Sequence, residues 1–172
     1  VAVGTVSVMG DEQVAQLIAD LTRRGLSIAT AESLTGGGLV ARLVDVPGAS
    51  HVVRGGVCTY AVDTKASVLG VSESRLTLTG PVDEQVARQM AAGARSLFGA
   101  SIGLSTTGVA GPGPADGFPA GTVHIACAHP AGVEHRLLHL EGDRAQVRAG
   151  AIDAALTLLR DVLDFSGVSA RD

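Results

Sequence analysis

A serine and the only lysine of the chain stand in two separate segments that suit nucleophilic chemistry. Ser33 lies in ATAESLTGGG, residues 29–38, where a β-prone run meets a glycine-rich helix start. Free backbone amides at a helix N-terminus favour anionic oxygen, so the amides around Thr35, Gly36 and Gly37 can hold an oxyanion or a phosphate beside Ser33. The same residues also fit a plain turn in which Ser33 or Thr35 caps the helix.

Lys65 lies in the segment GGVCTYAVDTKASVLGV, residues 55–71, together with the only tyrosine, Tyr60. Every other cationic side chain apart from histidine is arginine, which does not release its proton at useful pH. A lysine can serve as a base when burial lowers its pKa. A solvated lysine at a helix N-terminus is the competing interpretation, and sequence spacing also leaves open a histidine base beside Ser33.

A third segment, STTGVAGPGPADGFPAGTVHIA at 105–126, begins as a strand and becomes a loop rich in glycine and proline. Its glycines let backbone amides approach a ligand, so Thr107, Gly108 and Gly111 are candidate substrate-binding residues. Arg144 is the candidate cation for a substrate phosphate, with Arg148 as a further candidate. The alternatives are a plain surface loop and an Arg144 that only forms ion pairs on a helix surface.

The elements that must position these residues alternate between strand and helix. Helical spacing of apolar residues and turn signals between them predict helices at 11–24, from Leu39, within 64–78, at 83–98 and at 143–163, and strands at 26–31, 55–62, 101–106, 121–128 and 133–140. The helix at 83–98 is expected to bury Val86, Met90 and Leu97, with Asp83 as its cap. This order predicts a three-layer α/β domain with a mixed sheet of about five strands and helices on both faces. The turn at 130–132 predicts that the last two strands pair antiparallel.

Composition narrows the function classes. The 172 residues fit one domain, 11–172, after an N-terminal extension, 1–10, that lacks the positive start of a secretory signal. Apolar stretches are too short to span a membrane, and a net charge of −4 with 2% aromatic residues speaks against direct nucleic-acid binding. Cys58 and Cys127 are interpreted as buried thiols, and a cytoplasmic location is expected.

Familiar cofactor and metal motifs are missing from the sequence. There is no GxxxxGK[ST], no GxGxxG after a strand, no GxSxG and no HExxH. His135 and His139 share a strand face, with His124 and His129 nearby, but strand histidines more often form hydrogen bonds or face solvent. Neither a metal nor a cofactor is therefore expected.

Four ordered motifs resemble the C-terminal domain of the CinA family. They are AESLTGGG, GGVCTYAVDTKASVLGV, TTGVAGPGPADGFPAGTV and LEGDRAQVR, and the resemblance extends from about Asp11 to Leu163. That family includes nicotinamide-nucleotide amidohydrolases, also called NMN deamidases. The resemblance implies an α/β fold, a homo-oligomer and a pyridine mononucleotide substrate, with three catalytic residues: Ser33 as nucleophile, Lys65 as base, and Tyr60. Tyr60 is expected either to relay the proton to the departing ammonia or to hold Lys65 in place.

The chain also departs from the family pattern. Leu34 stands where the family usually has Cys, Val62 where it has an Asn-like residue, Asp83 where it has Ser, and residues 118–120 where it has Lys-Pro-Val. Val62 and Phe118 lack the polar groups that the family has at these positions, and this difference is expected to affect substrate preference. The expected function is deamidation of nicotinamide mononucleotide in pyridine nucleotide salvage. The alternatives are hydrolysis of another small amide and a catalytically weak nucleotide-sensing or protein-interaction module of the competence/damage-inducible type.

Overall fold

Helices and strands alternate along most of the chain in the computed structural model, which describes residues 7–165. Residues 1–6 of the expected extension and residues 166–172 of the expected domain lie outside the described part. The elements are α1 (Asp11–Arg24), β1 (Ile28–Glu32), α2 (Gly38–Val44), the 3-10 helix η1 (Ala49–His51), β2 (Val53–Cys58), α3 (Val62–Leu69), α4 (Glu73–Thr79), α5 (Glu84–Phe98), β3 (Ile102–Gly108), β4 (Thr122–His129), β5 (Gly132–His139) and α6 (Arg144–Phe165).

The sheet has five strands in the order β2-β1-β3-β4-β5. β1 pairs in parallel with both β2 and β3, whereas β4 pairs antiparallel with β3 and β5 pairs antiparallel with β4. Parallel strands need crossover connections, and the helices between them supply these. The predicted α/β fold with a mixed five-strand sheet is confirmed, including the antiparallel pairing of β4 with β5.

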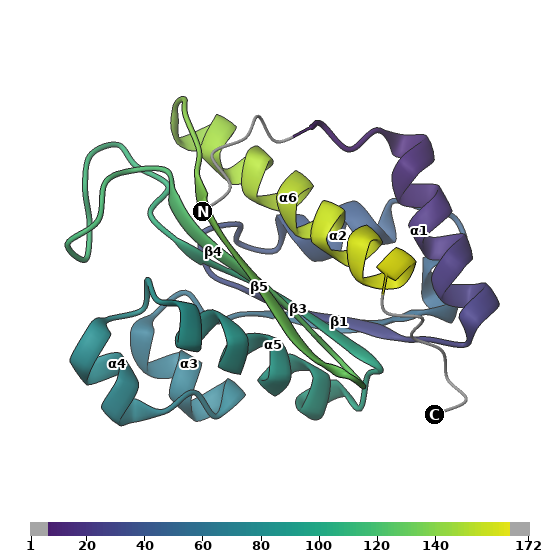
Figure 1. Ribbon diagram of the computed structural model, residues 1–172, viewed down its shortest axis with the longest axis horizontal. Helices are drawn as coiled ribbons and strands as arrows, with labels where there is room; N and C mark the ends of the chain where they lie inside the picture. Colours follow the sequence, from purple (N-terminus) through teal and green to yellow (C-terminus); the bar gives the residue numbers. More distant parts are fainter. Residues whose placement is uncertain (1–6, 166–172) are drawn as a thin grey trace.

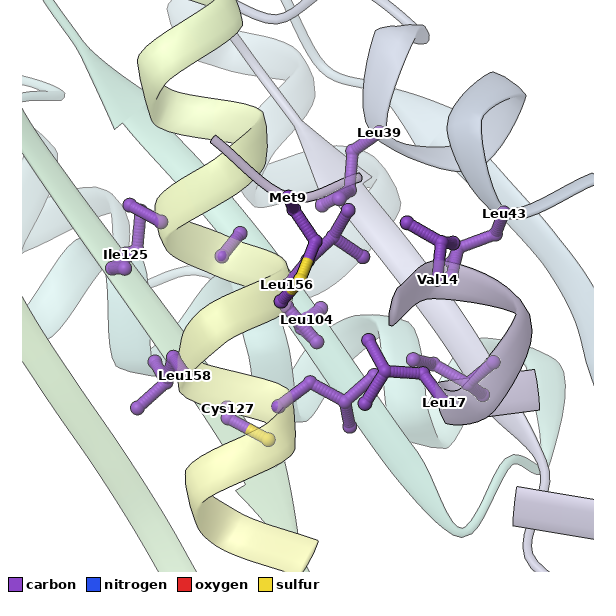
Figure 2. Packing of buried hydrophobic residues seen from close by; sticks show 14 of the residues in the cluster. Met9, Val14, Leu17, Leu39, Leu43, Leu104, Ile125, Cys127, Leu156 and Leu158 are labelled. Carbon is purple, nitrogen blue, oxygen red and sulfur yellow. The ribbon is translucent and has the colours of Figure 1, made fainter. Parts of the chain in front are cut away.

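Helices cover both faces of the sheet, as Figure 1 shows, with α1, α2 and α6 on one face and α3, α4 and α5 on the other. The larger core lies under α6, where side chains such as Leu104, Ile125, Leu156 and Leu158 are almost completely buried (Figure 2). A smaller core under α5 contains Met90. The central strands are buried along their whole length because both faces are covered.

Met9, within the expected N-terminal extension, also packs into the larger core and is only 3% exposed. Its carbonyl accepts a hydrogen bond from Arg42 Nη2 at 2.9 Å. The described end of that extension is therefore part of the packed domain.

Three local predictions are wrong. The strand expected at 55–62 ends at Cys58, because the chain turns after Thr59 and α3 begins at Val62. Cys58, at the end of an edge strand, is exposed rather than buried. Leu97 is 50% exposed, because the buried face of α5 runs through Val86, Met90 and Ala94 toward Phe98, a spacing of four that leaves Leu97 beside it.

The three parallel strands end at one edge of the sheet, and each of them leads into one of the segments singled out from the sequence. Ser33 follows β1, Tyr60 follows β2, and Thr107 and Gly108 end β3. In α/β sheets this carboxyl edge is where loops from neighbouring strands form a shared site.

No helix among residues 7–165 is long and apolar enough to cross a membrane.

Candidate active site

Ser33 and Lys65 meet inside the protein, although 32 residues separate them in sequence. Lys65 Nζ donates a hydrogen bond of 3.0 Å to Ser33 Oγ and one of 2.5 Å to the Thr59 carbonyl. β1 delivers Ser33, and α3 presents Lys65 from its first turn. Lys65 is completely buried and Ser33 is 9% exposed, so the pair is shielded from bulk water but borders a cavity.

Burial changes the acid–base behaviour of Lys65. Removal of the ammonium from water lowers the pKa of Lys65 from 10.5 to about 8, while the charge of Asp116 acts in the opposite direction. No salt bridge of Lys65 occurs within residues 7–165. The amine is therefore substantially neutral near pH 8. The lone pair of a neutral amine can accept the Ser33 O–H across the same 3.0 Å contact and so take its proton.

Glu32, the last residue of β1, holds the loop that carries Ser33. Its carboxylate is fully buried and accepts backbone hydrogen bonds of 2.8 to 3.0 Å from the amides of Gly37, Leu39 and Val40. The hydroxyls of Thr30 and Thr35 donate to the same carboxylate. Glu32 therefore satisfies the free amides at the start of α2 and takes the position that an external anion would otherwise occupy.

The geometry does not support the substrate contacts expected of Thr35, Gly36 and Gly37. Thr35 is buried, and its hydroxyl lies 2.8 Å from that of Thr106 in addition to donating to Glu32. The Gly36 amide donates to the Ser33 carbonyl, and the Gly37 amide is bound by Glu32. Neither Thr35 nor Ser33 caps α2, whose N-cap is Gly37 at φ +94°, a conformation that glycine adopts readily.

The backbone amide of Leu34 is the better placed donor. Leu34 directly follows Ser33 and lines the same cavity. Within the described residues its N–H donates to no protein acceptor, whereas the Ser33 N–H donates to the Thr106 carbonyl. The amide after a nucleophile is a common donor to an oxyanion, so the geometry favours the Leu34 amide over the glycine amides as a candidate donor.

A cavity of about 230 Å³ lies between the first and third segments and contains the remaining candidates. Its lining includes Thr107, Gly108, Gly111 and Arg144 together with Ser33, Tyr60 and Lys65. The Thr107 hydroxyl donates to the Pro81 carbonyl at 2.8 Å, which fixes one wall. The structure thus brings six expected residues, from three other parts of the chain, to the cavity that Ser33 lines.

Tyr60 and Arg144 form the mouth of this cavity. Arg144 donates to the Tyr60 hydroxyl at 3.0 Å and to the Gly111 carbonyl at 2.7 Å. Arg144 is exposed and forms no salt bridge within residues 7–165, so its remaining N–H groups are available to an anion. The Tyr60 hydroxyl hydrogen-bonds Arg144 and makes no hydrogen bond to Ser33 or Lys65 in the described part of the chain.

Arg148, the further phosphate candidate, is used differently. Its Nε donates to the Leu34 carbonyl at 2.9 Å and its Nη2 to the Thr35 carbonyl at 3.0 Å. The guanidinium therefore holds backbone of the Ser33 loop, and Arg144 alone remains as the candidate phosphate cation of this pair. Neither Glu32 nor the loop contact of Arg148 was assigned from sequence, although a carboxylate at the end of a buried strand before a glycine-rich helix start is a usable signal.

The histidines lie away from Ser33. His124 Nδ1 and His135 Nε2 are 2.9 Å apart, and ring centroids at 5.1 Å with an interplanar angle of 23° place the two nitrogens almost in line. That geometry suits a shared hydrogen bond and leaves no room for a metal between the rings. No group of three or more potential metal ligands occurs among residues 7–165, and no histidine lines the cavity beside Ser33.

The departures from the family pattern affect the site unequally. Val62 is 42% exposed and lines the cavity, so its apolar side chain faces any ligand. Phe118 lies in the tip of the third segment and does not line the cavity. Asp83 caps α5 by accepting from the amides of Gln85 and Val86, as predicted, and the Arg75 guanidinium lowers the pKa of its carboxyl.

Comparison with known proteins matches this chain to one family. Residues 11–163 match the family model of the CinA C-terminal domain. A CinA-like protein of Frankia casuarinae is 50% identical over 143 residues, 83% of this chain and 33% of the relative. A putative competence-damage inducible protein of Desulforamulus reducens is 44% identical over 89% of this chain and 38% of its own length. The chain thus spans about a third of the length of these curated relatives.

Solved structures give the same result. The competence/damage inducible protein CihA of Agrobacterium tumefaciens is 37% identical with a TM-score of 0.85, covering 93% of this chain and 99% of that one. A CinA superfamily protein of Escherichia coli is 32% identical with a TM-score of 0.87, covering 93% and 94%. The resemblance seen in the four motifs is confirmed, and the chain belongs to the CinA family, whose C-terminal domain it contains.

Proposed function

We propose that this domain is an amidohydrolase that converts nicotinamide mononucleotide to nicotinate mononucleotide and ammonia. The observation that carries the proposal is the contact between Ser33 Oγ and the buried amine of Lys65 at 3.0 Å. Burial of a lysine costs stability, and groups whose pKa is perturbed in this way concentrate at reactive sites. A serine activated by a neutral amine suits attack on an amide carbonyl.

The reaction begins with transfer of the Ser33 proton to Lys65 as Oγ attacks the carboxamide carbon. The negative charge that develops on the carbonyl oxygen is met by the Leu34 amide, and one such donor typically contributes about 3 kcal/mol. The tetrahedral intermediate collapses when Lys65 returns the proton to the leaving nitrogen, which departs as ammonia. Water, deprotonated by the same amine, then cleaves the acyl-serine ester and releases the carboxylate.

The nucleotide part of the substrate is assigned to the mouth of the cavity. Arg144 offers N–H donors to a phosphate, and its hydrogen bonds to Tyr60 and Gly111 fix the guanidinium in advance. In this proposal Tyr60 orients Arg144 rather than relaying a proton, since its hydroxyl lies on the arginine side. Thr107 and Gly108, which line the same cavity, are assigned to the pyridine ring. The choice of a pyridine mononucleotide rests on the four motifs shared with the family.

The test is a measurement of ammonia released by purified protein from nicotinamide mononucleotide, from free nicotinamide and from the dinucleotide. We expect release from the mononucleotide, and none from it with Ser33→Ala. Release by Ser33→Ala at the wild-type rate would overturn the nucleophile assignment. Binding of the mononucleotide without release would favour the sensing or protein-interaction module, and release from a different amide would change the substrate. A homo-oligomer and a cytoplasmic location remain further proposals from the family resemblance.

A further inference from the structure

The loop after the nucleophile is held from two opposite sides by opposite charges. On the inner side the Glu32 carboxylate accepts the amides of Gly37, Leu39 and Val40. On the other side the Arg148 guanidinium donates to the carbonyls of Leu34 and Thr35, the two residues after Ser33. Glu32 thus binds the end of the loop and the start of α2, and Arg148 binds the two carbonyls that follow Ser33.

The contact made by Arg148 is a two-point one. Nε and Nη2 of a guanidinium are rigidly coplanar, so two hydrogen bonds of 2.9 and 3.0 Å to successive carbonyls fix the orientation of two successive peptide groups. Because α6 begins at Arg144, Arg148 lies in the second turn of a 22-residue helix packed on the larger core. The guanidinium therefore fixes the loop relative to α6, which is a rigid element.

The contacts of Arg148 with the two carbonyls also determine where the backbone amides of the loop point. The only cis peptide bond among residues 7–165 joins Gly111 to Pro112, so the N–H of each loop peptide points opposite to its C=O. When Arg148 draws the Leu34 carbonyl toward α6, the Thr35 amide is turned away from α6. The Ser33 carbonyl is engaged by the Gly36 amide, which directs the Leu34 amide to the other side of the same turn. Arg148 thus stabilises the turn that presents the Leu34 amide beside Ser33.

We propose that Arg148 is a positioning residue for the reaction of Ser33, acting through the loop that carries the oxyanion donor. The benefit of Arg148 to amide hydrolysis depends on the proposed function, whereas the contacts by which Arg148 positions the Ser33 loop do not. Loss of Arg148 is expected to reduce the rate of attack by Ser33 while leaving substrate affinity nearly unchanged, because Arg148 does not line the cavity. Guanidinium ion added in solution should restore part of the rate.

The experiment measures labelling of Ser33 by a fluorophosphonate, which needs no natural substrate. Ser33 Oγ forms the O–P bond as the P–F bond breaks, fluoride leaves and Lys65 takes the proton; the phosphoryl oxygen occupies the oxyanion position. We expect Arg148→Ala to label about 10-fold to 100-fold more slowly and to recover with non-denaturing guanidinium, and Arg148→Lys, which keeps the charge but not the two-point fork, to fall between. Arg160→Ala, near the C-terminal end of the same helix and with a side chain that is 42% exposed, is the matched control and should label like the wild type.

The outcomes separate the two proposals. Labelling of folded Arg148→Ala at the wild-type rate, with only a lower melting temperature, would overturn the positioning role and leave Arg148 as a structural contact. If Arg148→Ala does not fold, Arg148→Lys is the variant to measure. A wild-type labelling rate and a wild-type kcat in Arg148→Lys would also overturn the positioning role. Labelled wild type that releases no ammonia from nicotinamide mononucleotide would remove the proposed substrate and leave the role of Arg148 in place. Wild type that is not labelled would overturn both.

Discussion

Two glycine-rich loops meet at the carboxyl edge of the sheet, but they are stabilised in opposite ways. The loop after β1, residues 33–37, is mostly buried and its polar groups are bound by Glu32 and Arg148. The loop between β3 and β4 is exposed from Pro112 to Gly117 and is held mainly by backbone contacts at its base and by Arg144. The first loop therefore suits chemistry, which requires fixed atoms, and the second suits recognition, which tolerates adjustment.

The largest expected effect comes from removing the amine of Lys65, which contacts Ser33 in the buried loop. Lys65→Met should reduce kcat by about 10³-fold or more, since no other base lies beside Ser33 within the described residues. The measurement is ammonia release from nicotinamide mononucleotide at pH 8. Activity within tenfold of the wild type would mean that another group accepts the proton.

The same variant should be more stable than the wild type. The pKa of Lys65 is about 8 in the folded state and 10.5 in the unfolded state. Burial of the amine therefore lowers the free energy of unfolding by its full amount below about pH 8 and leaves it unchanged above about pH 10.5. We expect Lys65→Met to gain about 1–3 kcal/mol at pH 7, and less as the pH rises toward 10. Urea unfolding at pH 7 and pH 10 measures both values, and an equal gain at both pH values would contradict the assignment.

The next largest effect on stability and kcat is expected from replacing Glu32. Glu32→Gln puts an amide N–H₂ where backbone amides already point, so we expect a loss of about 2–3 kcal/mol in unfolding free energy and about a 10²-fold lower kcat. Chemical denaturation and ammonia release are the measurements, with Glu141→Gln on the exposed surface as the matched control. A change in stability without a change in kcat would show that the carboxylate holds α2 but not the nucleophile.

In the exposed loop region, effects should appear in binding rather than in the chemical step. Arg144→Ala should raise the KM for nicotinamide mononucleotide about tenfold and change kcat little, because the lost contact is equally strong in substrate and transition state. Steady-state kinetics over a range of substrate concentrations separates the two parameters. A fall in kcat at unchanged KM would place Arg144 beside the reacting carboxamide instead.

The smallest effect is expected at the tip of the exposed loop. Asp116 raises the pKa of Lys65 through its charge, so Asp116→Asn should lower that pKa and move the rise of kcat with pH to slightly lower values. Because Asp116 is exposed, solvent screens its charge and the shift should be a fraction of a unit. A pH–rate profile of the variant against the wild type measures it, and a shift to higher pH would contradict the sign.

Much of this arrangement could be predicted from the residue pattern. Alternation of strand and helix predicted the mixed sheet, and the turn at 130–132 predicted the pairing of β4 with β5. Ser33 and Lys65 were paired through the family resemblance, since no spacing rule relates residues 32 positions apart. The contacts of Glu32 and Arg148 could not be predicted, because they depend on which backbone groups a folded turn leaves free, and sequence patterns do not record that.

The most direct test is an NMR titration of the amine of Lys65 in the folded wild-type protein. Lysine is represented once in the 172 residues, so selective labelling of lysine with ¹³C and ¹⁵N reports on this side chain alone. The proposed mechanism predicts a pKa of about 8, matched by the midpoint at which kcat rises with pH. A pKa near 10.5 in the folded protein would mean that Lys65 stays charged, and it would contradict its function as the base for Ser33.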